Sequence, residues 1–173
     1  MIPQTAWLDR KFDFDLPIGT FPLLLERLRG VPVRTKELVA GLPEHTLTTH
    51  VNDKWLVKEH VGHLADLELP DGRRLREFLN HAEVLSAADT ENGATEISDQ
   101  GSVPIVEIIR KLTAGREALV NRLDELKADQ VAIVAIHPRL QKPMRLLDWM
   151  YFVAEHDDHH LAQASGVITT LQR

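Results

Sequence analysis

The segment from Leu146 to Leu171 constrains the fold most, because it is long, free of proline and amphipathic. At about 100° per residue its apolar side chains fall on one stripe, which must be buried against other helices. The length corresponds to about seven turns, so the segment predicts one long helix. The stripe consists of Trp149, Val153, Ala164, Val167 and Leu171.

Two histidines, His156 and His160, lie near the middle of that stripe, and His159 lies at its edge. Two imidazoles four residues apart on one helix face can bind a single metal ion from the same side. A single core histidine is more often hydrogen-bonded in the interior than bound to metal, but two on one stripe would each need a separate partner unless they share an ion. The pair alone leaves metal binding and buried packing open, and a third ligand from another helix would decide between them.

Composition excludes several functional classes. The chain has 173 residues, 43% of them hydrophobic and 27% charged, which is ordinary for a single globular domain. Its formal net charge is -6 and its basic residues form no long run, so we expect no nucleic-acid partner. There is no cysteine, and any transition metal must therefore be held by histidine, aspartate or glutamate.

The sequence also lacks signals for export and for membrane insertion. Residues 1–20 contain no basic segment followed by an apolar core. No apolar run approaches the roughly 18 residues that a membrane span needs. We therefore expect a cytoplasmic protein without a membrane partner.

Further segments carry the helical period. Together with the last helix, and without credible strand pairing, they predict an all-α fold, a four-helix bundle whose core is formed where the side chains of facing helices meet. The whole chain, residues 1–173, is expected to form this one domain. The segments are residues 18–29 continuing over 35–39, residues 55–68 continuing over 73–85, and residues 103–126.

The remaining residues are expected to connect or cover these helices. Residues 1–17 predict an N-terminal arm on the outside of the domain, and residues 86–102, which are small and polar, predict a long crossing loop. Pro70 interrupts the second helical segment, which is either one bent helix or two. Val131 to Ile136 has strand character but no evident partner, so we interpret it as an extended connection.

The third ligand of a metal site has to come from the second helical segment, which offers His60 and His63. Helical phase favours His60, because it lies close to the apolar stripe of Val57, Leu64 and Leu67. His63 lies at the edge of that stripe. Periodicity alone therefore points to His60.

Several short motifs along the chain form a recognisable combination: Trp55 with Lys58-Glu59, His63-Leu64-Ala65-Asp66, His137-Pro138, and His156 with His160 and Gln163. Together they resemble the DinB-like superfamily of bacterial metal-binding four-helix bundles, over nearly all of the chain from about residue 18. The resemblance implies one metal ligand on the second helix and two on the last, which correspond to His63, His156 and His160. It selects His63 over His60, and it leaves His60 and His159 to support or packing around the site.

Three neutral imidazoles leave coordination positions open for water or substrate. The donor set suits Zn²⁺ or Ni²⁺, with Fe²⁺ or Mn²⁺ as alternatives. The resemblance implies a small-molecule substrate and either of two reactions, hydrolysis by metal-activated water or S-transfer from a metal-bound, low-molecular-weight thiol. It also implies a homodimer. A bundle with a structural metal and an interaction role, or a metal-free bundle with buried histidines, is the alternative.

Other polar groups near these histidines are not expected to coordinate the ion. Asp66 and Glu68 lie further along the second helix, and His137 precedes a proline in a segment expected outside the bundle. Asp157 and Asp158, beside the histidine pair, are expected to face solvent.

Overall fold

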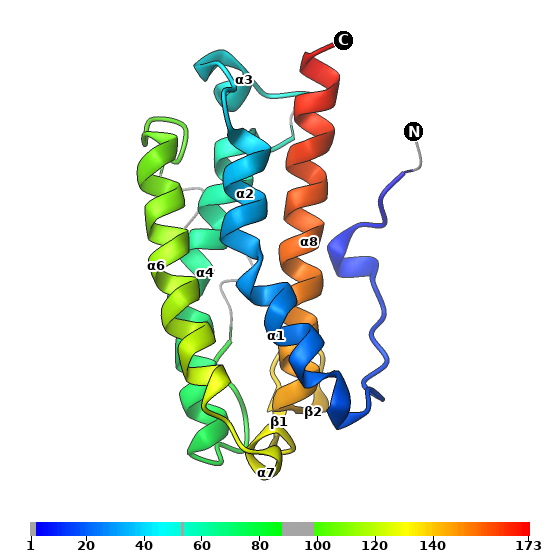
Figure 1. Cartoon of the computed structure of the whole chain (residues 1–173). Coiled ribbons are helices and arrows are strands. Elements are labelled where there is room, and N and C mark those ends of the chain that lie inside the picture. Colours follow the sequence, from blue (N-terminus) through cyan, green and yellow to red (C-terminus); the bar gives the residue numbers. More distant parts are fainter. Residues whose placement is uncertain (1–2, 53, 88–98) are drawn as a thin grey trace.

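The computed structural model describes residues 3–52, 54–87 and 99–173. Long helices lie side by side, and a small hairpin closes one end of the bundle (Figure 1). The bundle consists of α1 (Phe21–Arg29) and α2 (Val31–Val39), α4 (Val57–Leu79), α6 (Ile105–Asp124) and α8 (Leu146–Leu171). The smaller elements are η1 (Trp7–Asp9), η2 (Ile18–Thr20), α3 (Glu44–Thr48), α7 (Ala128–Val131), β1 (Val134–His137) and β2 (Lys142–Arg145).

The order of the helices differs from a simple up-and-down bundle. Helix α4 packs against both α6 and α8, and the α1–α2 pair also packs against both of them. Helices α4 and α6 run in the same direction (Figure 1), so the chain has to return along the bundle between them. Residues 88–98 of the predicted crossing loop lie outside the described residues. The predicted all-α four-helix bundle is confirmed.

The last helix begins and ends where its apolar period does. Helix α8 spans Leu146–Leu171, as the sequence predicts. Its first turn is closed by Asp148, whose Oδ2 accepts a hydrogen bond from the Arg145 backbone N–H at 3.0 Å. The unbroken period and this capping contact together explain why the boundaries were predictable.

The first two helical segments are interrupted as glycine and proline suggest, but not to the same extent. Gly30 separates α1 from α2, and Pro32 stands in the first turn of α2. By contrast, α4 continues as one helix through Pro70 to Leu79. The buried face of α4 therefore runs without interruption past the histidines to Asp71 and Arg74.

The interpretation of Val131–Ile136 as an unpaired connection is wrong. Strand β1 pairs antiparallel with β2, and Val84 forms an isolated parallel bridge with Ile136. The partner strand was hard to recognise because its sequence, Lys142 to Arg145, contains a proline and two cations and has little strand propensity. The hairpin matters for the site, since His137 is the last residue of β1 and Arg139 lies in the turn between β1 and β2.

The N-terminal arm is not confined to the outside of the domain. Phe12 is buried in the core, and its ring contacts the ring of Phe152 on α8 at a centroid distance of 5.0 Å. Trp7 packs on the same ring at 5.1 Å. Aromatic contacts thus hold the arm against the bundle, and no periodic pattern in the sequence predicts these contacts.

The core consists of two apolar clusters separated by a layer of buried polar groups. On α8, one cluster ends at Ala154 and the other starts at Ala164. On α6, the corresponding gap contains Arg116, which is almost completely buried. The α8 histidines, His156, His159 and His160, lie in this layer, and His63 of α4 lies next to it, so the layer marks the level of the candidate site.

Arg116 is the central cation of the polar layer. Its guanidinium pairs with Glu68 of α4 at 2.8 Å and with Asp157 of α8 at 2.6 Å. Gly115 makes room for the first pair, because a Cβ at this position would lie 2.5 Å from the Cβ of Glu68. A single side chain of α6 therefore joins the two helices that carry the histidines.

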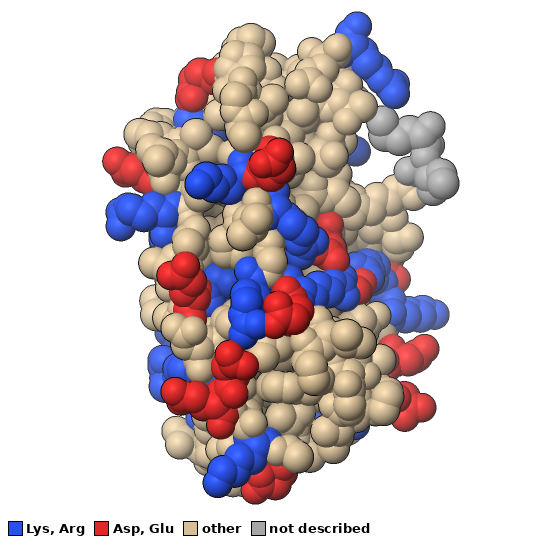
Figure 2. All heavy atoms as spheres, viewed as in Figure 1, with Lys and Arg blue, Asp and Glu red and all other residues tan. Residues whose placement is uncertain are grey.

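One face of the molecule is mixed in charge. On the face shown in Figure 2, lysine and arginine side chains alternate with aspartate and glutamate. Within the described residues, the helices lack the combination of length and apolar character that crossing a membrane requires.

Replacing Arg116 by methionine should lower the free energy of unfolding by about 3–5 kcal/mol, because two buried carboxylates lose their shared cation. Urea unfolding followed by circular dichroism measures this change. The matched control is Arg110→Met, an exposed position on the same helix, for which we expect a change within about 0.5 kcal/mol. A loss below about 1 kcal/mol for Arg116→Met would show that the pairs are not stabilising the bundle.

Candidate metal centre

The structure brings His63, His156 and His160 together between α4 and α8. Each offers one ring nitrogen, and these three atoms lie within 4.8 Å of one another. The ring centroids are 4.5 Å apart for His156 and His160, 4.6 Å for His63 and His160, and 5.3 Å for His63 and His156. Within the described chain, this is the one group of three or more histidines and carboxylates with metal-binding spacing.

The spacing of the two α8 imidazoles fits a shared ion. Nε2 of His160 lies 3.2 Å from Nε2 of His156. Two nitrogens bound to one tetrahedral Zn²⁺ at about 2.05 Å would lie about 3.3 Å apart. The donor set also fits, since three imidazoles without a fourth protein ligand leave a position for water or substrate.

His60 lies behind His160 rather than beside the other two ligands. Nδ1 of His60 is 3.1 Å from Nδ1 of His160. If Nε2 of His160 is the metal-binding atom, its Nδ1 carries the proton and donates a hydrogen bond to Nδ1 of His60. His60 then orients the His160 ring. Periodicity was right that His60 is buried, but the three-nitrogen cluster that periodicity assigned to His60 contains His63 instead.

Burial keeps the two α8 imidazoles neutral. Loss of solvent is the main cause that lowers the pKa of His156 well below its ordinary value of 6.5, and the nearby His63 lowers it further. Loss of solvent, followed by His156, lowers the pKa of His160 in the same way. A neutral imidazole has a free lone pair, so both rings are in the protonation state that a metal ligand needs.

Two tryptophans enclose the histidines from different parts of the chain. Trp55, just before α4, stacks on His160 at a centroid distance of 5.6 Å and contacts the edge of His63 at 5.2 Å. Trp7, from the arm, contacts His156 at 4.8 Å. The imidazoles are thereby held in place by packing as well as by hydrogen bonds.

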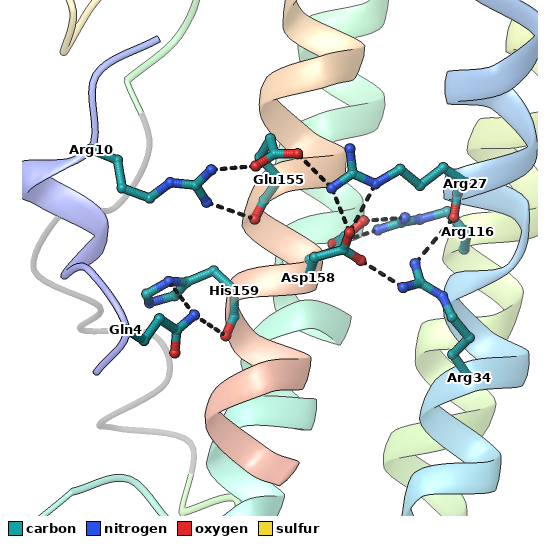
Figure 3. Close-up of polar contacts among 9 residues, drawn as sticks. Gln4, Arg10, Arg27, Arg34, Arg116, Glu155, Asp158 and His159 are labelled. Atoms are coloured by element: carbon teal, nitrogen blue, oxygen red, sulfur yellow. Dashed lines mark hydrogen bonds and ion pairs between the residues drawn. The ribbon is translucent and has the colours of Figure 1, made fainter. Parts of the chain in front are cut away.

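The arm is fastened to α8 beside the site. Gln4 donates from Nε2 to the backbone oxygen of His159 at 3.2 Å, and the same amide contacts Nδ1 of His159 at 3.0 Å. Arg10 forms an ion pair with Glu155 (Figure 3). These contacts hold Trp7 over the histidines.

The two aspartates of α8 do not simply face solvent as predicted. Asp157 is buried and accepts hydrogen bonds from Arg116 at 2.6 and 3.2 Å, so the prediction is wrong for this residue. Asp158 is partly exposed but is bound by Arg27 of α1 and Arg34 of α2 (Figure 3). Both carboxylates are engaged by arginines of other helices, which fixes the rotation of α8.

The other predicted non-ligands are held away from the three-histidine cluster, with one correction. Asp66 accepts hydrogen bonds from Gln100 and Lys111, and Glu68 pairs with Arg116. His137, however, is not outside the bundle. It is buried, and it lines the same cavity as the cluster, because the β-hairpin carries it inward.

A cavity of about 770 Å³ opens beside the three imidazoles. Its size lies within the range of small-molecule sites. Periodicity predicted the α8 histidines, and the family resemblance added His63. Both missed other groups that line the cavity: Trp7, Asp71, Arg74, Arg139 and Phe152. Of these, Asp71 and Arg74 follow His63 at helical spacing on α4, so that pattern carried a signal, whereas nothing in the sequence places Trp7 or Arg139 here.

Comparisons with known proteins agree with this architecture. The family model of the DinB superfamily matches residues 27–164. The fold is similar to that of YfiT from Bacillus subtilis, described as a probable metal-dependent hydrolase with an unusual four-helix bundle topology. The two chains are 19% identical, the TM-score is 0.84, and the match covers 94% of each chain. A search of curated proteins gives no match.

In the metal-free protein, the His156 and His160 rings should remain neutral well below pH 6.5, because burial lowers the pKa of both. NMR titration of the imidazole resonances measures this, with the exposed His45 as the internal control. Since the folded pKa lies below the unfolded value, these rings contribute stability that is present above pH 6.5 and is lost as the pH falls. Midpoints near 6.5 for both rings would contradict the buried, neutral site.

Proposed function

The chain belongs to the DinB superfamily, and from this premise we propose that it is a metal-dependent enzyme acting on a small molecule, with the ion held by His63, His156 and His160. The observation that carries the proposal is the convergence of three buried imidazole nitrogens on a cavity large enough for a substrate. A metal-free bundle would have to satisfy three clustered imidazoles separately, at a cost in free energy. A structural metal would be expected to have a fourth protein ligand.

The proposed ion is Zn²⁺ or Ni²⁺, with Fe²⁺ or Mn²⁺ as alternatives, since the donors are imidazoles. When bound, such an ion would act as a Lewis acid that lowers the pKa of a bound water or thiol and polarises a carbonyl group. The protein's own residues supply the surroundings. Trp7 and Trp55 pack on the ligand rings and restrict water, and His60 fixes the orientation of His160.

Hydrolysis is the reaction we propose first. The description of YfiT, a protein with the same fold, supports it. In this reaction the protein orients a carbonyl-bearing substrate in the cavity and excludes bulk solvent with its aromatic walls.

S-transfer from a low-molecular-weight thiol is the second candidate. The cavity volume of about 770 Å³ favours it, because this space accommodates a thiol and an electrophile together. The thiol cosubstrate, the homodimer and the cytoplasmic location stay predictions.

Elemental analysis of the purified variants tests the ligand set. His63→Ala, His156→Ala and His160→Ala should each abolish stoichiometric metal, because two imidazoles do not hold the ion. His60→Ala should keep about one ion per chain with affinity weakened about 10- to 100-fold, since it removes only the group that orients His160. His45→Ala, at an exposed position, is the control. Full occupancy of the His63→Ala variant and an empty His60→Ala variant would reverse the assignment of the third ligand.

Chelation should remove activity while leaving most of the helical signal, because the two apolar clusters hold the bundle without the ion. The metal-loaded chain is assayed with a panel of activated esters and amides, and in parallel with a haloaromatic electrophile and a small thiol. We expect turnover in one of these two assays to fall at least tenfold with EDTA, and circular dichroism to stay nearly constant. Complete unfolding on chelation would favour a structural metal.

A further inference from the structure

Arg139, in the turn between β1 and β2, is a cation in the cavity without an anionic partner in the described structure. It lines the cavity, and its Nη2 is buried without a hydrogen-bond partner. Its guanidinium lies 5.9 Å from the ring centroid of Trp7 and 5.6 Å from that of Phe152. Aromatic faces attract a guanidinium but leave its in-plane N–H donors free.

This situation differs from that of Arg27, Arg116 and Arg145. Burial opposes the charged form of Arg27 and Arg116, but their carboxylate partners outweigh it and raise the pKa of both groups, and Asp148 raises the pKa of Arg145. For Arg139 the pKa is lowered by burial, and no carboxylate of the described chain acts on it. A half-buried cation without a counter-charge loses solvation, and the aromatic contacts leave its N–H donors unpaired, which is typical of a group that receives its partner from a ligand.

His137 offers a second unused donor near Arg139. Its Nδ1 accepts a hydrogen bond from the Leu140 backbone N–H at 3.3 Å, so Nε2 carries the proton of the neutral ring. This Nε2 is buried and has no hydrogen-bond partner in the described structure. His137 also packs on Phe152 at 5.0 Å, the ring that Arg139 covers, so both unused donors border the same aromatic wall.

The remaining charges at this end of the cavity are already occupied. Arg74 donates two hydrogen bonds to the Ser86 backbone oxygen, at 3.2 and 3.0 Å. Asp71 interacts electrostatically with Arg74 and Arg116, and burial raises its pKa to about 6. Arg139 is not among the groups that act on Asp71, so this carboxyl does not serve as its counter-ion.

The two donors lie on the side of the cavity bordered by Trp7, which also touches the metal-site histidines. Trp7 contacts the Arg139 guanidinium on one side and the His156 ring, at 4.8 Å, on another. One aromatic ring therefore spans the distance between the unpaired cation and the three-histidine cluster. A small molecule bound along Trp7 can reach both.

We propose that Arg139 and His137 form a subsite for a carboxylate group, and that the small molecule bound in this cavity is a carboxylic acid whose other end lies at the three histidines. The carboxylate subsite is inferred from the unpaired donors of Arg139 and His137. The statement that the other end of the molecule lies at the three histidines rests on the proposed function. A planar carboxylate matches a guanidinium fork with two parallel hydrogen bonds, and the neutral His137 N–H can donate a third. The aromatic wall suits the apolar body of such a molecule.

The test compares two probes of nearly the same shape, phenylacetate and phenylacetamide. Binding to the purified full-length chain is measured by tryptophan fluorescence and by calorimetry, with and without one equivalent of Zn²⁺, and inorganic phosphate is titrated in parallel. We expect phenylacetate to bind at least tenfold more tightly than phenylacetamide and more tightly than phosphate, whether or not Zn²⁺ is present. Similar affinity for acid and amide, or tighter binding of phosphate, would overturn the proposal.

Variants locate the site. Arg139→Gln should weaken phenylacetate about ten- to hundredfold and leave phenylacetamide unchanged, because it removes charge-assisted hydrogen bonds. Arg139→Lys, which keeps the charge without the fork, should recover part of the loss. Arg110→Gln, an exposed arginine of α6, should have no effect. Unchanged phenylacetate binding in Arg139→Gln would overturn the proposal, and the probe comparison in the unsubstituted chain decides the matter if that variant does not fold.

The metal arm separates this inference from the proposed function. If phenylacetate binds only when Zn²⁺ is present, the ion itself is the anion site and the carboxylate subsite is wrong. If phenylacetate binds through Arg139 but the chain holds no metal, the subsite stands and the proposed enzyme does not.

Discussion

The buried ion pairs of Arg116 with Glu68 and Asp157 are the constraint on which the rest of the structure depends. They join α6 to both α4 and α8 at the level where the apolar core is interrupted. Buried charges are costly unless they are paired with good geometry, so only a narrow range of helix positions and rotations satisfies this contact. Asp157 directly follows His156 in sequence, and Glu68 lies on the same helix as His63. The pairs therefore fix the two helices whose imidazoles converge.

The candidate site is assembled from parts of different character on this fixed frame. The long helices supply the three imidazoles, the segment before α4 supplies Trp55, and the N-terminal arm supplies Trp7. The β-hairpin adds Arg139 and His137 at the other side of the cavity. Rigid helices thus carry the proposed metal ligands, whereas connections carry the groups that would choose the substrate, a division common in enzymes.

The sequence predicted the bundle because strong helical periods leave few alternatives, and α8 was predicted to the residue. Sequence patterns gave wrong predictions where the burial of a residue depends on a partner that is distant in the chain. Asp157 looks solvent-facing until Arg116, 41 residues away, is placed beside it. The choice between His60 and His63 depends on where ring nitrogens point, which Cα phase does not determine, and the family resemblance rather than periodicity selected His63. Aromatic and loop residues such as Trp7 follow no period at all.

The central claim is that three imidazoles hold one ion that keeps an exchangeable position beside the cavity. X-ray absorption spectroscopy of the Zn²⁺- or Ni²⁺-loaded protein tests it most directly, because it counts imidazole ligands around the ion and detects other light-atom ligands. The account predicts three imidazole nitrogens from His63, His156 and His160, with at least one further oxygen ligand that small anions displace. A shell closed by four protein ligands, or one with fewer than three imidazoles, would contradict it.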